Sequence, residues 1–109
     1  MTDVAGTDIE SYFLYKLTPP RPSFMMDMTP AEAATMAEHF EYWQRHVDAG
    51  RVVVYSPVAD PDGAWGLAVV RANSEDEVRA LGEDDPAISS TMATFDVYPM
   101  PGAVVRPSV

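Results

Sequence analysis

The sequence predicts an α+β fold in which four strands and two helices follow one another in the order β-α-β-β-α-β. An aromatic segment at residues 11–17 precedes a long amphipathic helix, two short apolar segments follow, and a second capped helix leads into a last strand. This is the order of the ferredoxin-like motif, an antiparallel sheet with two helices on one face. The length of 109 residues allows one domain, expected at residues 11–109, after a flexible N-terminus at residues 1–10.

The first strand, SYFLYKL, is predicted from its aromatic residues and is followed by the segment TPPRP. The prolines end the strand because proline donates no hydrogen bond to a neighbouring strand. Residues 23–28 are expected to form a loop that is unusually apolar. Within it, Met25 and Met26 beside Phe24 are candidates to line an adaptable apolar pocket.

The first helix carries start and stop signals. Thr29 is expected as the N-cap and Pro30 as the first helical residue, and Glu32 completes a capping box. The helix is expected to run to about Ala49 and to end at Gly50, because glycine readily adopts the left-handed conformation that terminates helices.

The other elements are bounded by turns and caps in the same way. Strands are predicted at residues 51–56, 64–72 and 92–98, with a turn at 60–63. Ser74 is expected to cap the second helix, which ends near Gly82. Asp85 and Pro86 are then expected to open a short turn before the last strand.

Both faces of the predicted strands are apolar, although two helices can cover only one face of a sheet. We therefore expect a second copy of the chain to cover the other face in a homodimer. The predicted faces are Tyr12 and Leu14 against Phe13, Tyr15 and Leu17; Val52 and Val54 against Val53 and Tyr55; and Trp65, Leu67 and Val69 against Ala68 and Val70.

Composition excludes several classes of function. The formal net charge of -10 disfavours nucleic acid and anionic membranes as partners, because like charges repel. The chain has no cysteine, which excludes disulfides and thiolate chemistry. The sequence shows neither a signal peptide nor an apolar run long enough to cross a bilayer, so a cytoplasmic protein is expected.

His39 is a candidate for proton transfer because of its place on the first helix. With Met36 taken as the centre of the apolar stripe, His39 lies about 60° away, where helix, sheet and solvent meet. Two interpretations are open: a structural histidine bonded to a backbone carbonyl, and a group that exchanges protons with a ligand. The predicted core stripe comprises Ala33, Met36, Phe40, Trp43 and Val47.

Asp85 is expected to cap the turn that begins at Pro86, which leaves one carboxylate oxygen to orient an imidazole.

The sequence gives no support for metal binding, serine nucleophiles or phosphate binding. His46 lies roughly 10 Å along the helix from His39, too far to share a metal ion, and we interpret it as a helix-end histidine that contacts the terminal carbonyls. No metal motif, serine nucleophile motif or phosphate-binding loop is present, so neither a metal nor a cofactor is expected.

Taken in order, these features resemble those of the YCII-related family, from about Tyr12 to Met100. The resemblance rests on the aromatic first strand, His39 eleven residues before Gly50, the strand that ends in Ser56-Pro57, the Asp-x-x-Gly turn that ends at Gly63, and Asp85-Pro86 after the second helix. The segment PPRPSFMMDMTPAE leading into EHFEYW is similar to one subgroup of that family.

The resemblance implies a ferredoxin-like fold whose dimers close two sheets into a barrel, and a site formed by a histidine and an aspartate that match His39 and Asp85. One family member is a dehydrochlorinase that acts on a chlorinated hydroxyquinol. The wider superfamily includes muconolactone isomerase-like enzymes and cofactor-free monooxygenases. Ser56 stands where the family has glycine, and Ala87 where it has phenylalanine, so the pocket is expected to be reshaped.

The leading hypothesis is a cofactor-free lyase or isomerase in which His39 is the general acid/base and Asp85 fixes its tautomer. An anionic group of a small-molecule substrate is expected to meet Arg21. The alternative is a non-catalytic protein that binds a small ligand in the same pocket. The residues expected to line this pocket are Phe24, Trp43, Tyr55 and Ser56.

Overall fold

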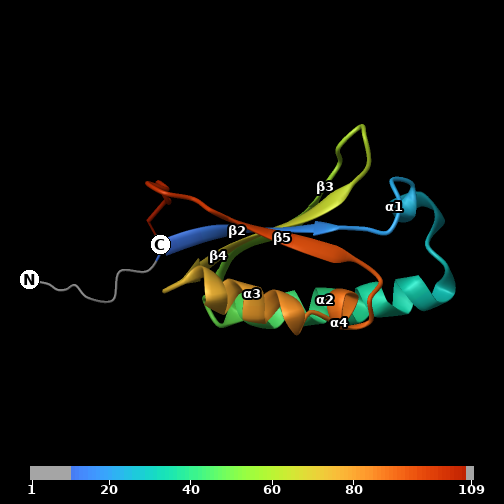
Figure 1. Ribbon diagram of the computed structural model, residues 1–109, viewed down its shortest axis with the longest axis horizontal. Helices are drawn as coiled ribbons and strands as arrows, with labels where there is room; N and C mark the ends of the chain where they lie inside the picture. The colour runs from blue at the N-terminus through green and yellow to red at the C-terminus, as the bar shows by residue number, and fades with distance from the viewer. Residues whose placement is uncertain (1–10, 108–109) are drawn as a thin grey trace, which may run out of the picture.

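The computed structural model describes residues 11–107, in the predicted order of elements (Figure 1). The flexible N-terminus predicted at residues 1–10 lies outside the described residues. The elements are β2 (Ser11–Thr18), α1 (Phe24–Asp27), α2 (Pro30–Asp48), β3 (Val52–Val58), β4 (Trp65–Ala72), α3 (Glu75–Glu83), α4 (Pro86–Ser89) and β5 (Thr94–Pro99).

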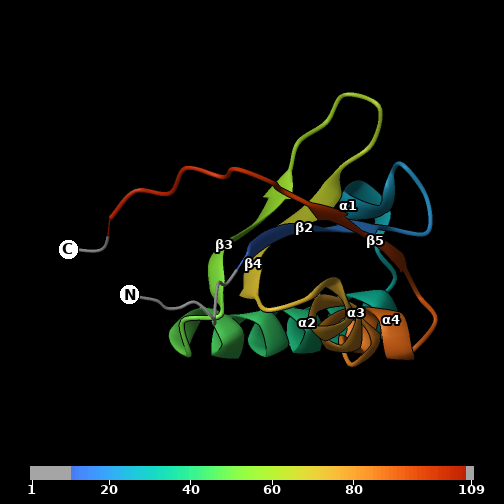
Figure 2. The same cartoon turned by 60° about the vertical axis from the view of Figure 1, so that its left-hand side comes forward.

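The strands form one antiparallel sheet in the order β3-β4-β2-β5, and the helices α2, α3 and α4 all lie on one face of it (Figures 1 and 2). On the central strand β2, Tyr15 pairs with Ala68 of β4 and with Val97 of β5. The predicted ferredoxin-like α+β fold is confirmed. The buried residues gather on the face of the sheet that the helices cover.

Burial alternates from residue to residue along β2. Phe13, Tyr15 and Leu17 point toward the helices and are buried. Helix α3 approaches the sheet closely at Gly82. A Cβ atom at that position would lie 2.6 Å from the ring of Phe95 and 2.8 Å from the ring of Tyr15. Glycine is therefore required there, and it leaves the phenol of Tyr15 inside the core.

The predicted ends of the first helix are confirmed in α2. The backbone N–H of Glu32 donates to the hydroxyl of Thr29 over 3.1 Å, and the backbone N–H of Thr29 donates to the Glu32 carboxylate over 2.9 Å. Pro30 opens the helix. Gly50, with φ of 82°, follows the C-cap as expected.

The predicted core face of this helix is right at Trp43 and Val47, which belong to the core, but wrong at Phe40 and Ala33. Phe40 is 53% exposed, whereas His39 is 3% exposed and Trp43 is fully buried. Ala33, also placed in the core stripe, is exposed. The buried face is centred on aromatic residues with polar tips, because the folded protein supplies hydrogen-bond partners that a hydropathy pattern does not reveal.

Two local features also differ from the prediction. The segment expected as a loop at residues 23–28 contains the helical turn α1, in which Phe24 is buried. In β3, Val52 pairs with Val70 and Val54 with Val69, so a β-bulge interrupts the alternation. As a result, Tyr55, which pairs with Ala68, joins Val52 on the helix-covered face, and the predicted assignment of faces in this strand is wrong.

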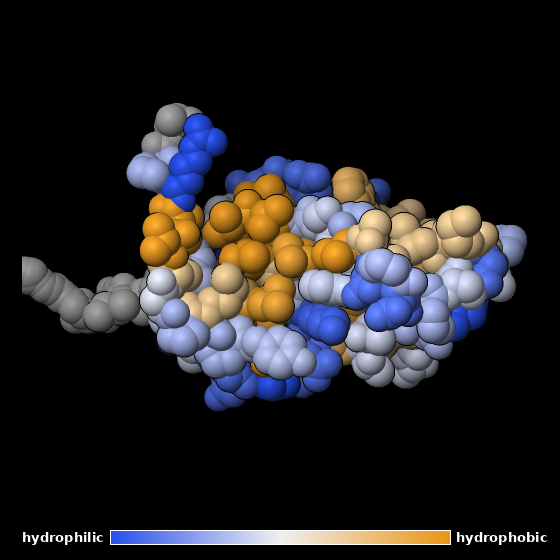
Figure 3. Space-filling view, turned by 90° about the horizontal axis from the view of Figure 1, so that it is seen from above, coloured by the Kyte–Doolittle hydropathy of each residue, from blue (hydrophilic) through white to orange (hydrophobic). Residues whose placement is uncertain are grey.

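The other face of the sheet carries no helix, and apolar side chains gather on it, coloured orange in Figure 3. Val54 is 45% exposed and Tyr98 is 48% exposed. Among the described residues, no helix is long and apolar enough to cross a membrane.

Candidate active site

His39 of α2 and Asp85, the N-cap of α4, form a buried pair. The Nδ1 atom of His39 lies 2.8 Å from Oδ1 and 2.9 Å from Oδ2 of Asp85. The side chains of His39 and Asp85 are 3% and 0% exposed. The structure thus brings together the two residues that sequence reasoning selected, and it joins them directly without room for a water molecule between them.

Asp85 accepts hydrogen bonds from three further donors. The hydroxyl of Tyr15 and the indole N–H of Trp43 both donate to Oδ2 over 2.8 Å, and the backbone N–H of Ala87 donates to Oδ1 over 2.9 Å. The last bond is the predicted N-cap. A buried carboxylate requires such partners, because an unpaired charge is costly away from water.

These donors determine the charge of the pair. Burial by itself would raise the pKa of Asp85, but the hydrogen bond and charge of His39, with the bonds from Trp43 and Ala87, hold this pKa below its ordinary value. Asp85 is therefore an ionised acceptor at neutral pH. Nδ1 of His39 must then carry the proton that it shares with Asp85, and Nε2 is the nitrogen left for a ligand.

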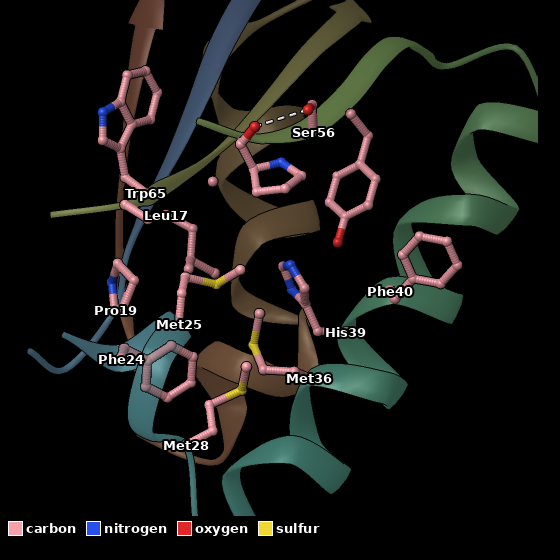
Figure 4. A pocket seen from close by; sticks show the side chains of 14 residues that line it. Leu17, Pro19, Phe24, Met25, Met28, Met36, His39, Phe40, Ser56 and Trp65 are labelled. Atoms are coloured by element: carbon pink, nitrogen blue, oxygen red, sulfur yellow. Dashed lines mark hydrogen bonds between the residues drawn. The ribbon is translucent and has the colours of Figure 1, made fainter. Parts of the chain in front are cut away.

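A cavity of about 340 Å³ adjoins His39 between α1, α2 and the ends of β3 and β4 (Figure 4). In Figure 4 the imidazole points from α2 into the space bordered by Met25 and Met36. The lining residues are Leu17, Pro19, Phe24, Met25, Met28, Met36, His39, Phe40, Tyr55, Ser56, Pro57, Ala64, Trp65 and Gly66.

Tyr55 is a polar side chain that lies beside the imidazole on the cavity wall. The ring centroids of Tyr55 and His39 lie 5.6 Å apart, and the Phe40 ring lies 5.8 Å from that of Tyr55. Burial, with a smaller contribution from the negative charge of Asp85, raises the pKa of Tyr55 to about 12. Tyr55 is therefore a neutral phenol at physiological pH, able to donate a hydrogen bond.

The predicted pocket residues divide into two groups. Phe24, Tyr55 and Ser56 line the cavity, whereas Trp43 lies behind the His–Asp pair with no exposed surface. The hydroxyl of Ser56 donates to the carbonyl of Pro57 over 2.8 Å, which leaves its oxygen able to accept. Trp43 contributes through its bond to Asp85 and not through contact with a ligand.

Arg21 does not line the cavity, so its predicted contact with an anionic substrate group finds no support. Its guanidinium donates to Asp27 over 2.8 Å and forms two bonds with Glu32 of 2.8 and 2.9 Å. These bonds fasten α1 to the start of α2. Bonding to Arg21 lowers the pKa of Glu32 to about 2, with a further contribution from the backbone N–H of Thr29.

Sequence reasoning missed Tyr15, Met28 and Met36 as members of the site. Tyr15 follows the strand alternation of an ordinary core residue, and nothing local marks its hydroxyl as a partner of Asp85. Of the two methionines expected beside Phe24, Met25 lines the cavity and Met26, at 90% exposure, does not.

His46 lies in the last turn of α2 as predicted, but its ring contacts Arg51 and not the terminal carbonyls. Its Nδ1 atom lies 3.4 Å from the guanidinium of Arg51, and burial together with the charges of Arg51 and Arg45 lowers its pKa. Within residues 11–107, no three histidine, aspartate or glutamate side chains lie close enough together to hold a metal ion.

The fold and site define a small α+β protein with a buried histidine–carboxylate pair beside an apolar cavity. Residues 14–101 match the model of the YCII-related domain, and the chain belongs to this family. The resemblance inferred from the sequence is confirmed. No curated protein matches the chain.

Among solved structures, the chain is similar to 5-chloro-2-hydroxyhydroquinone dehydrochlorinase from Burkholderia phenoliruptrix AC1100, in complex with 2,5-dihydroxybenzoquinone. The TM-score is 0.59 at 19% sequence identity, over 79% of this chain and 89% of that chain. This similarity supports the ferredoxin-like fold.

Proposed function

We propose that this protein is a small cofactor-free enzyme, a lyase or isomerase that moves a proton on a cyclic or aromatic metabolite. The observation that carries the proposal is the buried contact between His39 and an ionised Asp85 at the wall of an apolar cavity. His39 is the general acid/base of the proposed reaction, and Asp85 fixes its tautomer and orientation.

In the proposed reaction each ring nitrogen of His39 has its own task. Nδ1 donates its proton to Asp85, so Nε2 carries the lone pair that accepts a proton from a carbon or oxygen atom of the substrate. The imidazolium that forms is stabilised by the carboxylate of Asp85. Return of the proton to another atom completes an isomerisation. In a lyase, the electrons of the broken C–H bond form a double bond as the leaving group departs with its own electron pair.

The comparison supports the same class of chemistry. The similar solved structure is that of a dehydrochlorinase, and its bound ligand is a six-membered ring compound. A cavity of about 340 Å³ lies within the range that holds ligands of this size. An apolar wall beside a lone base is suited to a substrate whose ring packs against carbon and sulfur atoms while one acidic hydrogen meets the imidazole.

We further propose that the protein is a homodimer in which the helix-free faces of two sheets pack together. The support is the apolar surface that gathers on that face (Figure 3), together with the exposure of Val54 and Tyr98. Burying such a surface would add to the stability of a chain of this size.

The experiment is a screen of ring compounds with acidic C–H groups, including chlorinated hydroxyaromatics, in deuterated buffer. Proton exchange and chloride release are followed by NMR and ion chromatography. His39→Asn is expected to abolish turnover of any substrate found, because asparagine takes up no proton near neutral pH. His46→Asn, on the same helix outside the cavity, is the matched control and is expected to remain active. Turnover that survives in His39→Asn, while the variant remains folded by circular dichroism, contradicts the assignment of His39 as the base.

A further inference from the structure

The walls of the cavity are almost entirely apolar. Three methionines, two phenylalanines, a leucine, prolines and a tryptophan make up most of its lining, and the polar side chains are those of His39, Tyr55 and Ser56. These three come from α2 and β3, whereas α1 with its C-cap residue and the first half of α2 supply Phe24, Met25, Met28 and Met36 (Figure 4). The cavity therefore has one polar end and one apolar end.

Within the described residues, no lysine, arginine, aspartate or glutamate lines this space. The nearby cations are engaged elsewhere. Arg21 bonds to both Asp27 and Glu32. The ammonium of Lys16 lies 4.8 Å from the ring centroid of Trp65, and Lys16 alternates with Leu17 on β2, so it belongs to the opposite face of the sheet from this cavity-lining leucine.

A carboxylate lies beside the same tryptophan, so the charges next to Trp65 are of both signs. The indole N–H of Trp65, a lining residue, donates to the carboxylate of Asp60 over 3.2 Å. The chain as a whole carries a formal net charge of -10. A ligand carboxylate at the apolar end would lose its water without gaining a cationic partner among the lining residues, and the negative net charge of the chain would oppose its entry.

We infer that the site selects ligands that are uncharged at the end remote from His39: a flat or compact apolar ring system with a single hydroxyl or acidic C–H group. This inference deepens the proposed function and rests on it, because His39 defines the polar end. The thioethers of Met25, Met28 and Met36 suit such a ring, since methionine adjusts to irregular shapes and packs well against aromatic faces.

Two probes that share the hydroxynaphthalene ring system test this selectivity. Binding of 2-naphthol and of 6-hydroxy-2-naphthoic acid, which adds a carboxylate at the distal end, is measured by calorimetry at pH 7. We expect 2-naphthol to bind at least about tenfold more tightly, because a buried carboxylate without a partner is strongly disfavoured. Equal affinity, tighter binding of the acid, or no binding of 2-naphthol overturns the inference.

Two methionine variants test whether the preference for the uncharged probe arises inside the cavity. Met25→Lys places an ammonium at the apolar wall, where the residue is 45% exposed and the longer chain can reach water. It is expected to bring the affinity for the naphthoic acid to within about threefold of that for 2-naphthol. Met26→Lys adds the same charge at a neighbouring residue outside the cavity and is expected to leave the preference unchanged. An equal gain in both variants shows that net charge alone sets the preference and overturns the inference.

A third variant separates this inference from the proposed function. His39→Gln is expected to weaken both probes while keeping the preference for the uncharged one. If both probes bind His39→Gln as tightly as the unaltered protein but the preference persists, the selectivity stands and the role of His39 in the proposed function fails. If His39→Gln weakens binding but the acid binds as well as 2-naphthol, the role of His39 stands and the selectivity fails.

Discussion

The hydroxyl of Tyr15 donates a 2.8 Å hydrogen bond to the carboxylate of Asp85, seventy residues further along the chain. The bond joins the central strand of the sheet to the turn before α4, inside the core. The imidazole of His39 contacts the same carboxylate. The polar network of the candidate site is therefore also part of what holds the sheet to its helices.

Replacement of Tyr15 by phenylalanine is expected to lower the free energy of unfolding by about 1–3 kcal/mol, because Asp85 loses a donor that nothing else replaces in the core. Urea unfolding at pH 7 measures the effect. Tyr55→Phe is the matched control. The hydroxyl of Tyr55 is not among the donors to Asp85, so its loss is expected to cost less. An equal cost for the two variants contradicts the role given to Tyr15.

Acid is expected to destabilise the protein through Asp85. The pKa of Asp85 is lower in the folded protein than in the unfolded chain, so its contribution is complete above the unfolded value of about 4 and is lost as pH falls through the folded value. Glu32, with a pKa of about 2, contributes in the same direction. Urea unfolding is measured between about pH 6 and pH 2.

Asp85→Asn is expected to be less stable at pH 6 and to lose less stability on acidification, because the titrating group is gone. Glu32→Gln supplies the comparison for a half-buried carboxylate. A pH dependence in Asp85→Asn as steep as that of the unaltered protein contradicts the prediction.

The phenol of Tyr55 is expected to ionise only in strong alkali, near pH 12. Its folded pKa lies above the unfolded value of about 10, so its contribution to stability is complete below pH 10 and is lost as pH rises toward 12. Phenolate absorbance of the unaltered protein minus that of Tyr55→Phe isolates this titration from that of Tyr42, whose pKa is also raised to about 12. A difference curve centred at the ordinary value for tyrosine contradicts the burial of Tyr55.

The helix-free face of the sheet is expected to hold two chains together. Val54→Glu places a charge on this face at a residue that is 45% exposed in the single chain, so the fold itself should tolerate it. Sedimentation is expected to change from a dimer to a species near 11.9 kDa. Met26→Glu, which adds the same charge at a site that is 90% exposed, should leave the dimer intact. A folded monomer in the unaltered protein contradicts the proposal.

The sequence predicted the structural features that depend on residues close together in the chain. Capping residues such as Thr29 and Asp85 act within a few positions of themselves, so the ends of α2 and the start of α4 could be identified in advance. The contact between His39 and Asp85 followed from their places in the fold. Tyr15, Arg21 and Trp43 were not predictable in their roles, because a hydroxyl, a guanidinium and an indole bond to groups that only tertiary structure brings near.

The bulge in β3 determines which side chains face the cavity. A regular strand would turn Tyr55 toward the helix-free face, since one residue of register reverses every side chain. Deleting Val53, the unpaired residue of the bulge, is expected to restore regular pairing with Val54 still opposite Val69 and Tyr55 still opposite Ala68, so Tyr55 stays at the cavity wall. The bulge thus absorbs one extra residue of β3 and keeps the side chains that follow it on the faces set by their partners in β4.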